Sequence, residues 1–360
     1  MIEHWNLERL RTIGCTPALM QQAALLAHGL QDPALLRVVE VQREGMALHD
    51  GDAEHAARLL PALRAALEAD ADAVACGDWV LAARNGLGEW WVHERLAPLN
   101  QLARRLHDGR DKVMRAVIVS NVDTALLVMG LDHDFSLRRL ERFVALVHMA
   151  GVTPVVVLTK ADLCDDVERR LAQVQALLPA HAQVVAVNAL EATAAQALAP
   201  WLNAGQTLVL LGSSGAGKST LTNAITGNVV ALTQANRAGD NRGRHTTTVR
   251  TLHATPQGAC IIDTPGLRTL RLDTDEQQLA GAFDDIGSLA LACRFRDCRH
   301  QAEPGCAVRG QVDEQRLRNY HKLLREVQRD HLSALERKAQ VQVWKSRARH
   351  ARVRMAAKRG

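Results

Sequence analysis

The chain has 360 residues, which is too many for one compact core and predicts two or three domains. Hydrophobic residues make up 47% and charged residues 23%, as in ordinary globular proteins. No segment approaches the roughly 20 consecutive apolar residues of a membrane span, and the polar N-terminus excludes a secretion signal. We therefore expect a cytoplasmic protein with no membrane partner, and we take it to be a monomer.

Seven cysteines in a chain without an export signal argue against a disulfide framework. Three of them cluster near the C-terminus and are considered below. The others are scattered and are predicted to be small buried hydrophobic residues: Cys15, Cys76, Cys164 and Cys260.

Positive charge gathers at the C-terminal end, although the net charge is only +5 and the pI is near 9.0. Residues 341–360 contain no acid but seven basic residues: Lys345, Arg347, Arg349, Arg352, Arg354, Lys358 and Arg359. Such a tail suits a phosphate-rich partner such as nucleic acid. A solvated, frayed terminus explains it equally well, so the tail alone decides nothing.

The first 110 residues begin with a helical segment and continue with short strand patterns and turns. We expect strands near residues 45–51, 77–82 and 90–92, and a helix over residues 61–67. The pattern favours a small β-barrel but does not identify its fold.

From about residue 114, buried apolar runs alternate with amphipathic helices. The predicted helices are residues 136–147, capped by Ser136, and residues 167–178. Continuous apolar strands between helices indicate a mostly parallel sheet that is covered on both faces. The predicted strands are residues 117–119, 125–129, 155–158, 184–187, 208–211 and 258–262. From about Leu279 the chain is helical and charged.

One glycine-rich loop carries the clearest chemical signal. It fits the pattern G-x-x-x-x-G-K-[ST], follows a buried strand and precedes an amphipathic segment. Its backbone N–H groups and the following helix N-terminus suit phosphates, with Lys218 on the β- and γ-phosphates and Ser219 on Mg²⁺. The predicted nucleotide-binding residues are Gly212, Ser213, Ser214, Gly215, Ala216, Gly217, Lys218, Ser219 and Thr220.

Two downstream segments complete the phosphate site. Asp263 follows an apolar strand in the pattern D-x-x-G, so its carboxylate suits Mg²⁺ and the N–H of Gly266 suits the γ-phosphate. Between the two motifs, residues 239–248 are rich in glycine, basic and hydroxyl side chains. This loop offers a threonine, Thr247, that could complete the Mg²⁺ shell, although an ordinary Thr-rich loop would have the same composition.

Base selection is predicted from an upstream segment. Thr159-Lys160-Ala161-Asp162 resembles the guanine-binding motif N-K-x-D, in which the carboxylate accepts hydrogen bonds from the base and the lysine stem packs on the base plane. Thr159 stands where asparagine is usual, so we expect guanine specificity with reduced affinity. Asn188 and Ala189 resemble the second base-contacting loop, usually S-A-L or S-A-K.

The order of these motifs is unusual, because the guanine motif precedes the phosphate loop by about 50 residues. This order indicates a circularly permuted GTPase domain. Further along, the pattern C-x4-C-x-H-x5-C supplies a complete tetrahedral set for one structural Zn²⁺: Cys293, Cys298, His300 and Cys306. Nearby arginines make this segment a plausible RNA-facing surface.

Together, the motif order, Asn121-Val122-Asp123, the preceding β region and the Cys/His cluster resemble the ribosome small subunit-dependent GTPase A family (RsgA, also called YjeQ). The resemblance extends over residues 77–320. It implies an OB-fold in residues 1–112, a permuted GTPase domain in 113–275 and a helical zinc domain in 276–340, followed by the basic tail 341–360. It also implies a GTPase that binds GTP and GDP, contacts 16S rRNA and is activated by the 30S ribosomal subunit during late maturation.

Slow intrinsic hydrolysis is also predicted. Leu267 occupies the position after the D-x-x-G motif at which many GTPases carry a water-orienting glutamine. His245 is a candidate for positioning the water, or it is simply an exposed histidine. Two alternative functions stay open: an ATP-using P-loop enzyme, and an RNA-binding module with a degenerate nucleotide site.

Overall fold

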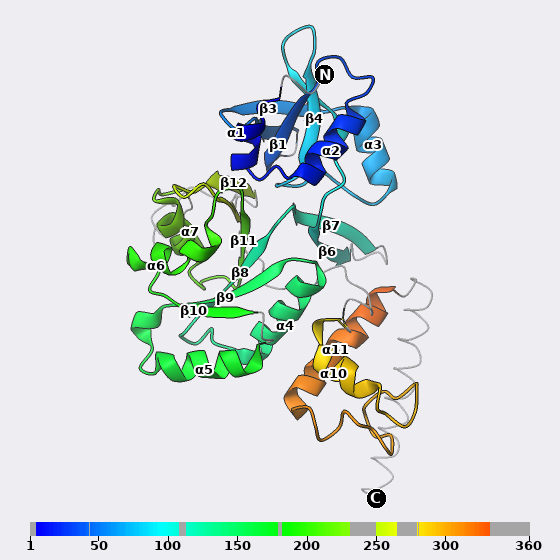
Figure 1. Cartoon of the computed structure of the whole chain (residues 1–360), viewed down its shortest axis with the longest axis vertical. Helices are drawn as coiled ribbons and strands as arrows, with labels where there is room; N and C mark the ends of the chain where they lie inside the picture. The colour runs from blue at the N-terminus through cyan, green and yellow to red at the C-terminus, as the bar shows by residue number, and fades with distance from the viewer. Residues whose placement is uncertain are drawn as a thin grey trace, which may run out of the picture. The chain divides into compact units, whose positions relative to one another are not determined.

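The computed structural model describes residues 5–42, 44–107, 113–178, 182–230, 250–264, 279 and 281–331 (Figure 1). The chain divides into two compact units. One comprises Met1–Arg104 with Arg115–Leu272, and the other comprises Arg105–Met114 with Asp273–Gly360. Among the described residues, no helix combines the length and the hydrophobicity needed to cross a membrane.

The first unit begins with two short helices and a closed five-stranded barrel. Asn6 and Thr16 cap α1 (Leu7–Thr12) and α2 (Pro17–Leu26) by accepting hydrogen bonds from backbone N–H groups. The barrel closes because β1 pairs with β2, β2 with β3, β3 with β5, β5 with β4, and β4 again with β1. Its elements are β1 (Ala34–Val41), β2 (Met46–His49), β3 (Glu54–Leu59), α3 (Pro61–Ala69), β4 (Trp79–Arg84) and β5 (Trp90–Arg95).

This barrel has the arrangement of an OB-fold, with a helix between its third and fourth strands. Its interior is filled by apolar side chains from alternate strand positions, including Leu36, Val38, Leu48, Val80 and Val92. The expected barrel and the helix near residues 61–67 are therefore confirmed. The sequence pattern did not indicate β1, whose apolar run is interrupted by Arg37, or the largely polar β3.

A separate two-stranded sheet follows, formed by β6 (Gln101–His107) and β7 (Val113–Ser120). The strands that follow form a larger sheet in the first unit, in the order β10-β9-β8-β11-β13-β12. Neighbouring strands in this sheet are parallel, except that β12 runs antiparallel to β13. The strands are β8 (Thr124–Gly130), β9 (Thr153–Thr159), β10 (Gln183–Ala186), β11 (Thr207–Gly212), β12 (Thr251–Ala254) and β13 (Cys260–Asp263).

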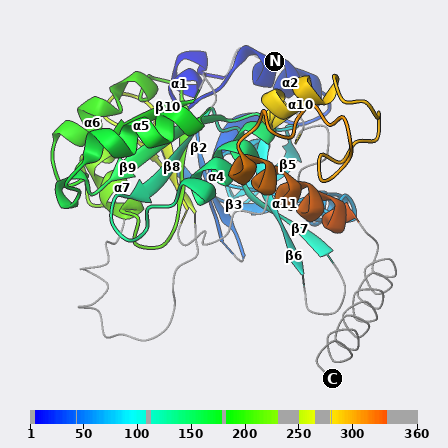
Figure 2. The ribbon, with the colours of Figure 1, turned by 90° about the horizontal axis from the view of Figure 1, so that it is seen from below.

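Helices cover both faces of this sheet, as predicted for a mostly parallel sheet (Figure 1, Figure 2). Leu126 and Val128 of β8 belong to a core that includes Leu221 and Ile225 of α7. Because side chains alternate along a strand, Leu127 of β8 points to the opposite face, where α4 packs on β8 and β9. The helical elements are α4 (Leu137–Met149), η1 (Ala161–Leu163), α5 (Val167–Leu177), α6 (Thr193–Ala197), η2 (Ala199–Trp201) and α7 (Lys218–Thr226).

The barrel and this sheet are joined through their strands. Glu40 of β1 lies opposite Thr251 of β12, so the barrel continues the sheet at its antiparallel edge. Beside this pairing, the fully buried guanidinium of Arg37 donates hydrogen bonds to the carbonyl of Asn121 at 3.3 Å and to the hydroxyl of Thr207 at 2.9 Å. These contacts fix the start of β11, the strand that leads into the phosphate loop.

The second unit contains α10 (Asp284–Ala290) and α11 (Glu314–His331). Arg316 of α11 binds the carboxylate of Asp285 through two hydrogen bonds of 2.7 Å and lies 4.9 Å over the ring of Phe283. The Phe283 ring also meets Tyr320 edge to face, with centroids 5.4 Å apart. These contacts pack α10 against α11.

All seven cysteines are free, so the structure contains no disulfide. Cys15, Cys76 and Cys260 are buried, as predicted. The prediction was wrong for Cys164, which is only half-buried, because it lies in the turn between η1 and α5 rather than in a strand.

Candidate functional site

The glycine-rich loop lies between the end of β11 and the start of α7. Gly212 ends the strand where a Cβ atom would stand 2.2 Å from the carbonyl oxygen of Val128, so no larger residue fits beside β8. Gly217 caps α7 in the left-handed region, with φ of 90°. The helix N-terminus therefore directs its free N–H groups into the loop, an arrangement suited to phosphate binding.

Lys218 is the buried cation of this loop. Its side chain is only 7% exposed, and its ammonium group donates to the carbonyl oxygens of Gly212 at 3.0 Å and Ser213 at 2.7 Å. Ser214 and Gly215 form the exposed crest, whereas Ala216 is buried below it. The loop thus places one positive charge beneath an exposed ring of backbone groups.

The predicted guanine motif ends β9, two strands away from β11. The hydroxyl of buried Thr159 donates to the carbonyl oxygen of Ala216 at 2.6 Å, which ties the motif to the phosphate loop. Lys160 follows in a left-handed conformation with φ of 59°, and Asp162 is exposed in the turn of η1. The side chain that stands where asparagine is usual thus contacts the phosphate loop through its hydroxyl.

The second predicted base-contacting loop follows β10. The side chain of Asn188 is held within this loop. Its Oδ1 accepts a hydrogen bond from the N–H of Leu190 at 3.1 Å, and its Nδ2 donates to the carboxylate of Glu191 at 2.9 Å. The N–H of Ala161 reaches the carbonyl of Val187 at 3.4 Å, which joins this loop to the guanine motif. A hollow of about 370 Å³ opens where the loop meets α7, lined by residues that include Ala189, Leu190, Thr220 and Asn223.

Asp263 ends β13, which pairs in parallel with β11. The Thr264 hydroxyl donates to the Leu210 carbonyl and holds the two strand ends together. Because parallel strands end at the same edge, Asp263 and Ser219 belong to the edge that carries the phosphate loop. The remaining predicted residues of this region lie outside the described part of the chain: His245, Thr247, Gly266 and Leu267.

Two acidic residues of this edge were not predicted from the sequence. Asp132 and Asp134 follow β8 and contact Lys160 and Ser213, respectively. A sequence signal was present, because both carboxylates come directly after a buried strand, as the two recognised motifs do. No named motif contains them, however, and their partners are distant in sequence.

In the second unit, the predicted metal ligands converge. The ligand atoms of Cys293, Cys298, His300 and Cys306 all lie within 4.8 Å of one another. Nδ1 of His300 lies 3.6 Å from the Cys293 sulfur and 3.5 Å from the Cys306 sulfur. A tetrahedral zinc with ordinary bond lengths separates sulfur and nitrogen ligands by about 3.6 Å, so these spacings fit the ion.

The loop around these ligands is arranged by its backbone. His300 has a left-handed φ of 59°, and the carboxylate of Glu303 accepts N–H bonds from Arg299, Gln301 and Ala302 at 3.1, 2.9 and 3.0 Å. The N–H of Ala307 donates to the sulfur of Cys293 at 3.3 Å, which helps to hold this side chain in the cluster.

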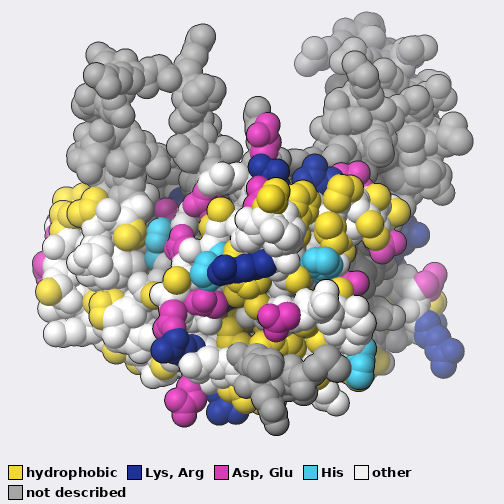
Figure 3. Space-filling view, turned by 90° about the horizontal axis from the view of Figure 1, so that it is seen from above, with side chains coloured by type: hydrophobic (Ala, Val, Ile, Leu, Met, Phe, Trp, Pro, Cys, Tyr) yellow, Lys and Arg dark blue, Asp and Glu magenta, His cyan; other side chains and the backbone are white. Residues whose placement is uncertain are grey.

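The barrel surface carries aromatic and basic side chains. Arg58 lies 5.9 Å over the ring of Trp91, and Arg84 lies 4.8 Å over Trp90. Trp91, Arg84 and His93 line a hollow of about 750 Å³. Figure 3 shows hydrophobic, basic, acidic and histidine side chains mixed on the face that it draws.

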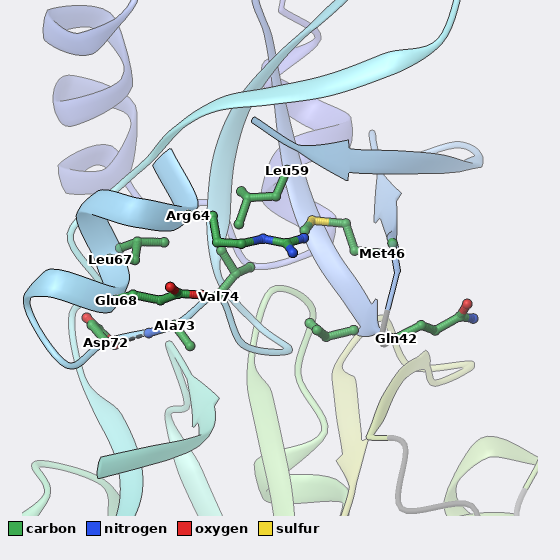
Figure 4. Close-up of a pocket in the computed structure, with 11 residues that line it drawn as sticks. Gln42, Met46, Leu59, Arg64, Leu67, Glu68, Asp72, Ala73 and Val74 are labelled. Atoms are coloured by element: carbon green, nitrogen blue, oxygen red, sulfur yellow. Dashed lines mark hydrogen bonds between the residues drawn. The ribbon is translucent and has the colours of Figure 1, made fainter. Parts of the chain in front are cut away.

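A smaller hollow of about 200 Å³ lies between α3 and the barrel strands (Figure 4). Arg64 extends from α3 across it toward Met46 and Leu59, while Asp72 lies at its margin, hydrogen-bonded to the N–H of Ala73 at 2.8 Å. Apolar and charged side chains both line this hollow, and none of its lining residues is a predicted site residue.

Comparison with known proteins identifies close relatives of this chain. The sequence profile of the RsgA GTPase matches residues 97–273. The protein called small ribosomal subunit biogenesis GTPase RsgA 2 in Vibrio parahaemolyticus is 46% identical over 269 residues, 73% of each chain. Small ribosomal subunit biogenesis GTPase RsgA of Xanthomonas axonopodis pv. citri is 44% identical over 312 residues, 85% of this chain and 84% of its own.

Two solved structures share the fold. YjeQ from Thermotoga maritima matches 82% of this chain and 98% of its own, with a TM-score of 0.60 and 23% identity. YloQ, described as a circularly permuted GTPase, matches 85% of this chain and 98% of its own, with a TM-score of 0.57 and 24% identity. The expected architecture of barrel, permuted GTPase domain and C-terminal Cys/His domain is thereby confirmed, and the chain belongs to the RsgA GTPase family.

Proposed function

We propose that this chain hydrolyses GTP to GDP and phosphate as an assembly factor for late maturation of the small ribosomal subunit. The observation that carries the proposal is the Thr159–Ala216 hydrogen bond, which joins a guanine motif to a phosphate loop in permuted order. The names of the relatives, small ribosomal subunit biogenesis GTPases, support the same function.

The nucleotide contacts follow from the site geometry. Asp162, exposed at the turn after β9, accepts hydrogen bonds from the guanine N1 and N2 hydrogens, while the stem of Lys160 packs on the base. The loop from Gly212 to Thr220 surrounds the phosphates, and Lys218 turns from its carbonyl partners toward the β- and γ-phosphates. Asn188 and Ala189 close the other side of the base.

Oxygen ligands for Mg²⁺ are available at the same edge. Ser219 and Asp263 offer a hydroxyl and a carboxylate, the donor types that Mg²⁺ prefers, and Thr247 of the loop between them is the proposed additional ligand. The ion, when bound, neutralises charge on the β- and γ-phosphates. The N–H of Gly266 is the proposed contact to the γ-phosphate.

Hydrolysis requires a positioned water, and Leu267 has no polar group to hold one. We assign this role to His245, which precedes β12 in the sequence and is two residues from Thr247. Docking on the 30S subunit accelerates turnover, which makes the protein a switch between GTP-bound and GDP-bound forms.

The Cys/His cluster holds one structural Zn²⁺, because all four tetrahedral positions are filled by protein ligands and none is open for catalysis. With the barrel and the basic tail, this domain contacts 16S rRNA. The protein acts as a cytoplasmic monomer.

The decisive test measures GTP turnover with and without purified 30S subunits. We expect strong stimulation by 30S subunits, and equal rates would refute the ribosomal role. Asp162→Asn tests the base assignment: it should reduce the preference for GTP over ATP by about a hundredfold, since two charge-assisted hydrogen bonds are altered. An unchanged preference would favour the alternative of an ATP-using P-loop enzyme.

His245→Ala tests the water-positioning role separately. Stimulated kcat should fall by about a hundredfold, while GDP binding stays close to that of the unmodified protein. Unchanged stimulated kcat would remove His245 from the mechanism.

A further inference from the structure

The loop after β8, residues 131–136, lies between the two halves of the nucleotide site. In the sheet order, β8 stands between β9, which leads into Lys160, and β11, which leads into the phosphate loop. The three strands are parallel, so their carboxyl ends meet at one edge. The loop after β8 is therefore placed between the two segments, and its side chains can contact either one.

Asp132 contacts the guanine-motif side. Its carboxylate forms an ion pair with the ammonium of Lys160 at 2.7 Å, with side-chain exposures of 17% and 29%. Partial burial alone would raise the pKa of Asp132, but the hydrogen bond from Lys160 and the N–H of Asp134 lower it below its ordinary value. Gly130 provides the necessary space, because a Cβ atom there would stand 2.6 Å from Oδ1 of Asp132.

Asp134 contacts the phosphate-loop side. One carboxylate oxygen accepts from the hydroxyl of Ser213 at 2.6 Å, and the other is bound by Arg139 at 2.6 Å. The N–H of Asp134 donates to Asp132 at 3.0 Å. The two residues are thus joined by a backbone-to-carboxylate hydrogen bond. Asp132 binds Lys160 of the guanine motif, and Asp134 binds Ser213 of the phosphate loop.

We propose that Asp132 and Asp134 are positioning residues for the nucleotide. Asp132 holds the Lys160 side chain in the direction in which its stem covers the guanine plane, and Asp134 fixes Ser213 and with it the start of the phosphate loop. The inference rests on the proposed function, since it takes Lys160 as a base contact. It adds that residues outside every recognised motif determine how firmly the base is held.

The ion pair has a consequence for affinity rather than for stability alone. A lysine side chain has four rotatable bonds, and binding must restrict them if the stem is to lie along the base. An ion pair that restricts them beforehand removes part of that entropic cost from binding. If the ion pair had only a structural role, its removal would lower the stability of the protein and would affect GDP and pyrophosphate binding equally.

Calorimetric titration of the full-length protein with GDP and with pyrophosphate separates base from phosphate contacts. Asp132→Asn should weaken GDP binding by about tenfold and leave pyrophosphate binding unchanged. Asp134→Asn should weaken both by a similar factor, because Ser213 belongs to the phosphate loop. Asp165→Asn is the matched control: it removes the same charge from an exposed side chain of the same domain and should change neither.

Lys160→Ala separates a failure of the proposed base contact from a failure of the positioning role of Asp132. If Lys160→Ala leaves GDP binding unchanged, the base assignment in the proposed function is wrong. If Lys160→Ala weakens GDP binding but Asp132→Asn does not, only the positioning role is wrong. In the Lys160→Ala background, Asp132→Asn should have no further effect, and an additive loss would overturn the inference.

Gly130→Ala provides a variant that retains every charge. The added methyl group should displace the Asp132 carboxylate from Lys160 and reproduce the selective loss of GDP affinity. Pyrophosphate binding by the same variant reports that the phosphate loop is folded. Undiminished GDP affinity in this variant would contradict the proposal.

Discussion

The hydroxyl of Thr159 donates a hydrogen bond of 2.6 Å to the carbonyl oxygen of Ala216. The two residues are 57 positions apart, and both are buried, with exposures of 1% and 0%. Because the bond lies away from water, it fixes the distance between the segment that contacts the base and the loop that surrounds the phosphates.

Thr159→Val should therefore weaken GDP binding by about tenfold. The substitution keeps the shape of the side chain but leaves the Ala216 carbonyl without its donor, a loss of about 1–3 kcal/mol. Thr159→Ser, which keeps the hydroxyl, serves as the control and should bind GDP nearly as the unmodified protein does. Equal GDP affinity of the valine and serine variants in calorimetric titrations would show that the bond is dispensable.

Asp78 should make the barrel less stable as the pH rises. Burial raises the pKa of its carboxyl from 3.8 to about 6, an effect that Arg95 and the N–H of Ala75 only partly offset. The folded protein therefore binds this proton more tightly than the unfolded chain, so stability is lost as the pH rises from about 4 to above 6.

Asp78→Asn removes this titration and keeps an acceptor for the Ala75 N–H, which lies 2.8 Å from Asp78. Between pH 4 and pH 7.5 the unmodified protein should lose about 3 kcal/mol of unfolding free energy relative to the variant. Urea denaturation followed by tryptophan fluorescence measures this difference, since Trp79, Trp90 and Trp91 lie in the barrel. Asp70→Asn changes an exposed residue of the same region and serves as the control. If the unfolding free energies of Asp78→Asn and of the unmodified protein changed with pH in the same way, the prediction would be contradicted.

Arg37→Met should lower the free energy of unfolding by about 3 kcal/mol, because it leaves buried acceptors at Asn121 and Thr207 without a donor. Arg58→Met is the matched control, since Arg58 is an exposed arginine that stacks on Trp91 at the barrel surface. Urea midpoints of the two variants give the comparison. A similar small effect in both would mean that the buried guanidinium contributes little to the junction.

Cys306→Ser should abolish stable zinc binding and unfold the C-terminal unit locally. Zinc content measured by mass spectrometry should fall from one ion per chain to a small fraction of that value, and the helical circular dichroism should decrease. Cys164→Ser, outside the cluster, should retain the ion. Full zinc occupancy in Cys306→Ser would exclude that thiolate as a required ligand.

Motifs with short-range spacing could be recognised from the sequence. The phosphate loop, the guanine motif and the Cys/His cluster are each contained in a few consecutive residues, and each follows a recognisable strand or turn. Strands β8, β9, β11 and β13 were likewise evident, because strands covered on both faces are almost entirely apolar. The half-buried edge strand β10 was evident from its run of valines.

Long-range pairings could not be predicted in the same way. Arg37 interrupts the apolar run of β1, and its burial makes sense only with acceptors from Asn121 and Thr207, far along the chain. The roles of Asp132 and Asp134 depend on partners that only the sheet order brings near. The hydrogen bond from Thr159 to Ala216 is a pairing of the same kind, because its partners are 57 positions apart in the sequence.

The strand pairing between Glu40 and Thr251 has a practical consequence for work with fragments of this protein. A truncated chain that starts after the barrel would expose the outer N–H and C=O groups of β12 to solvent. Uncovered strand edges recruit other chains, so such a fragment should self-associate and precipitate even if its nucleotide site is intact. In the full-length chain, β1 of the barrel pairs with this edge of the sheet. The barrel and the sheet should therefore be expressed together in a single chain.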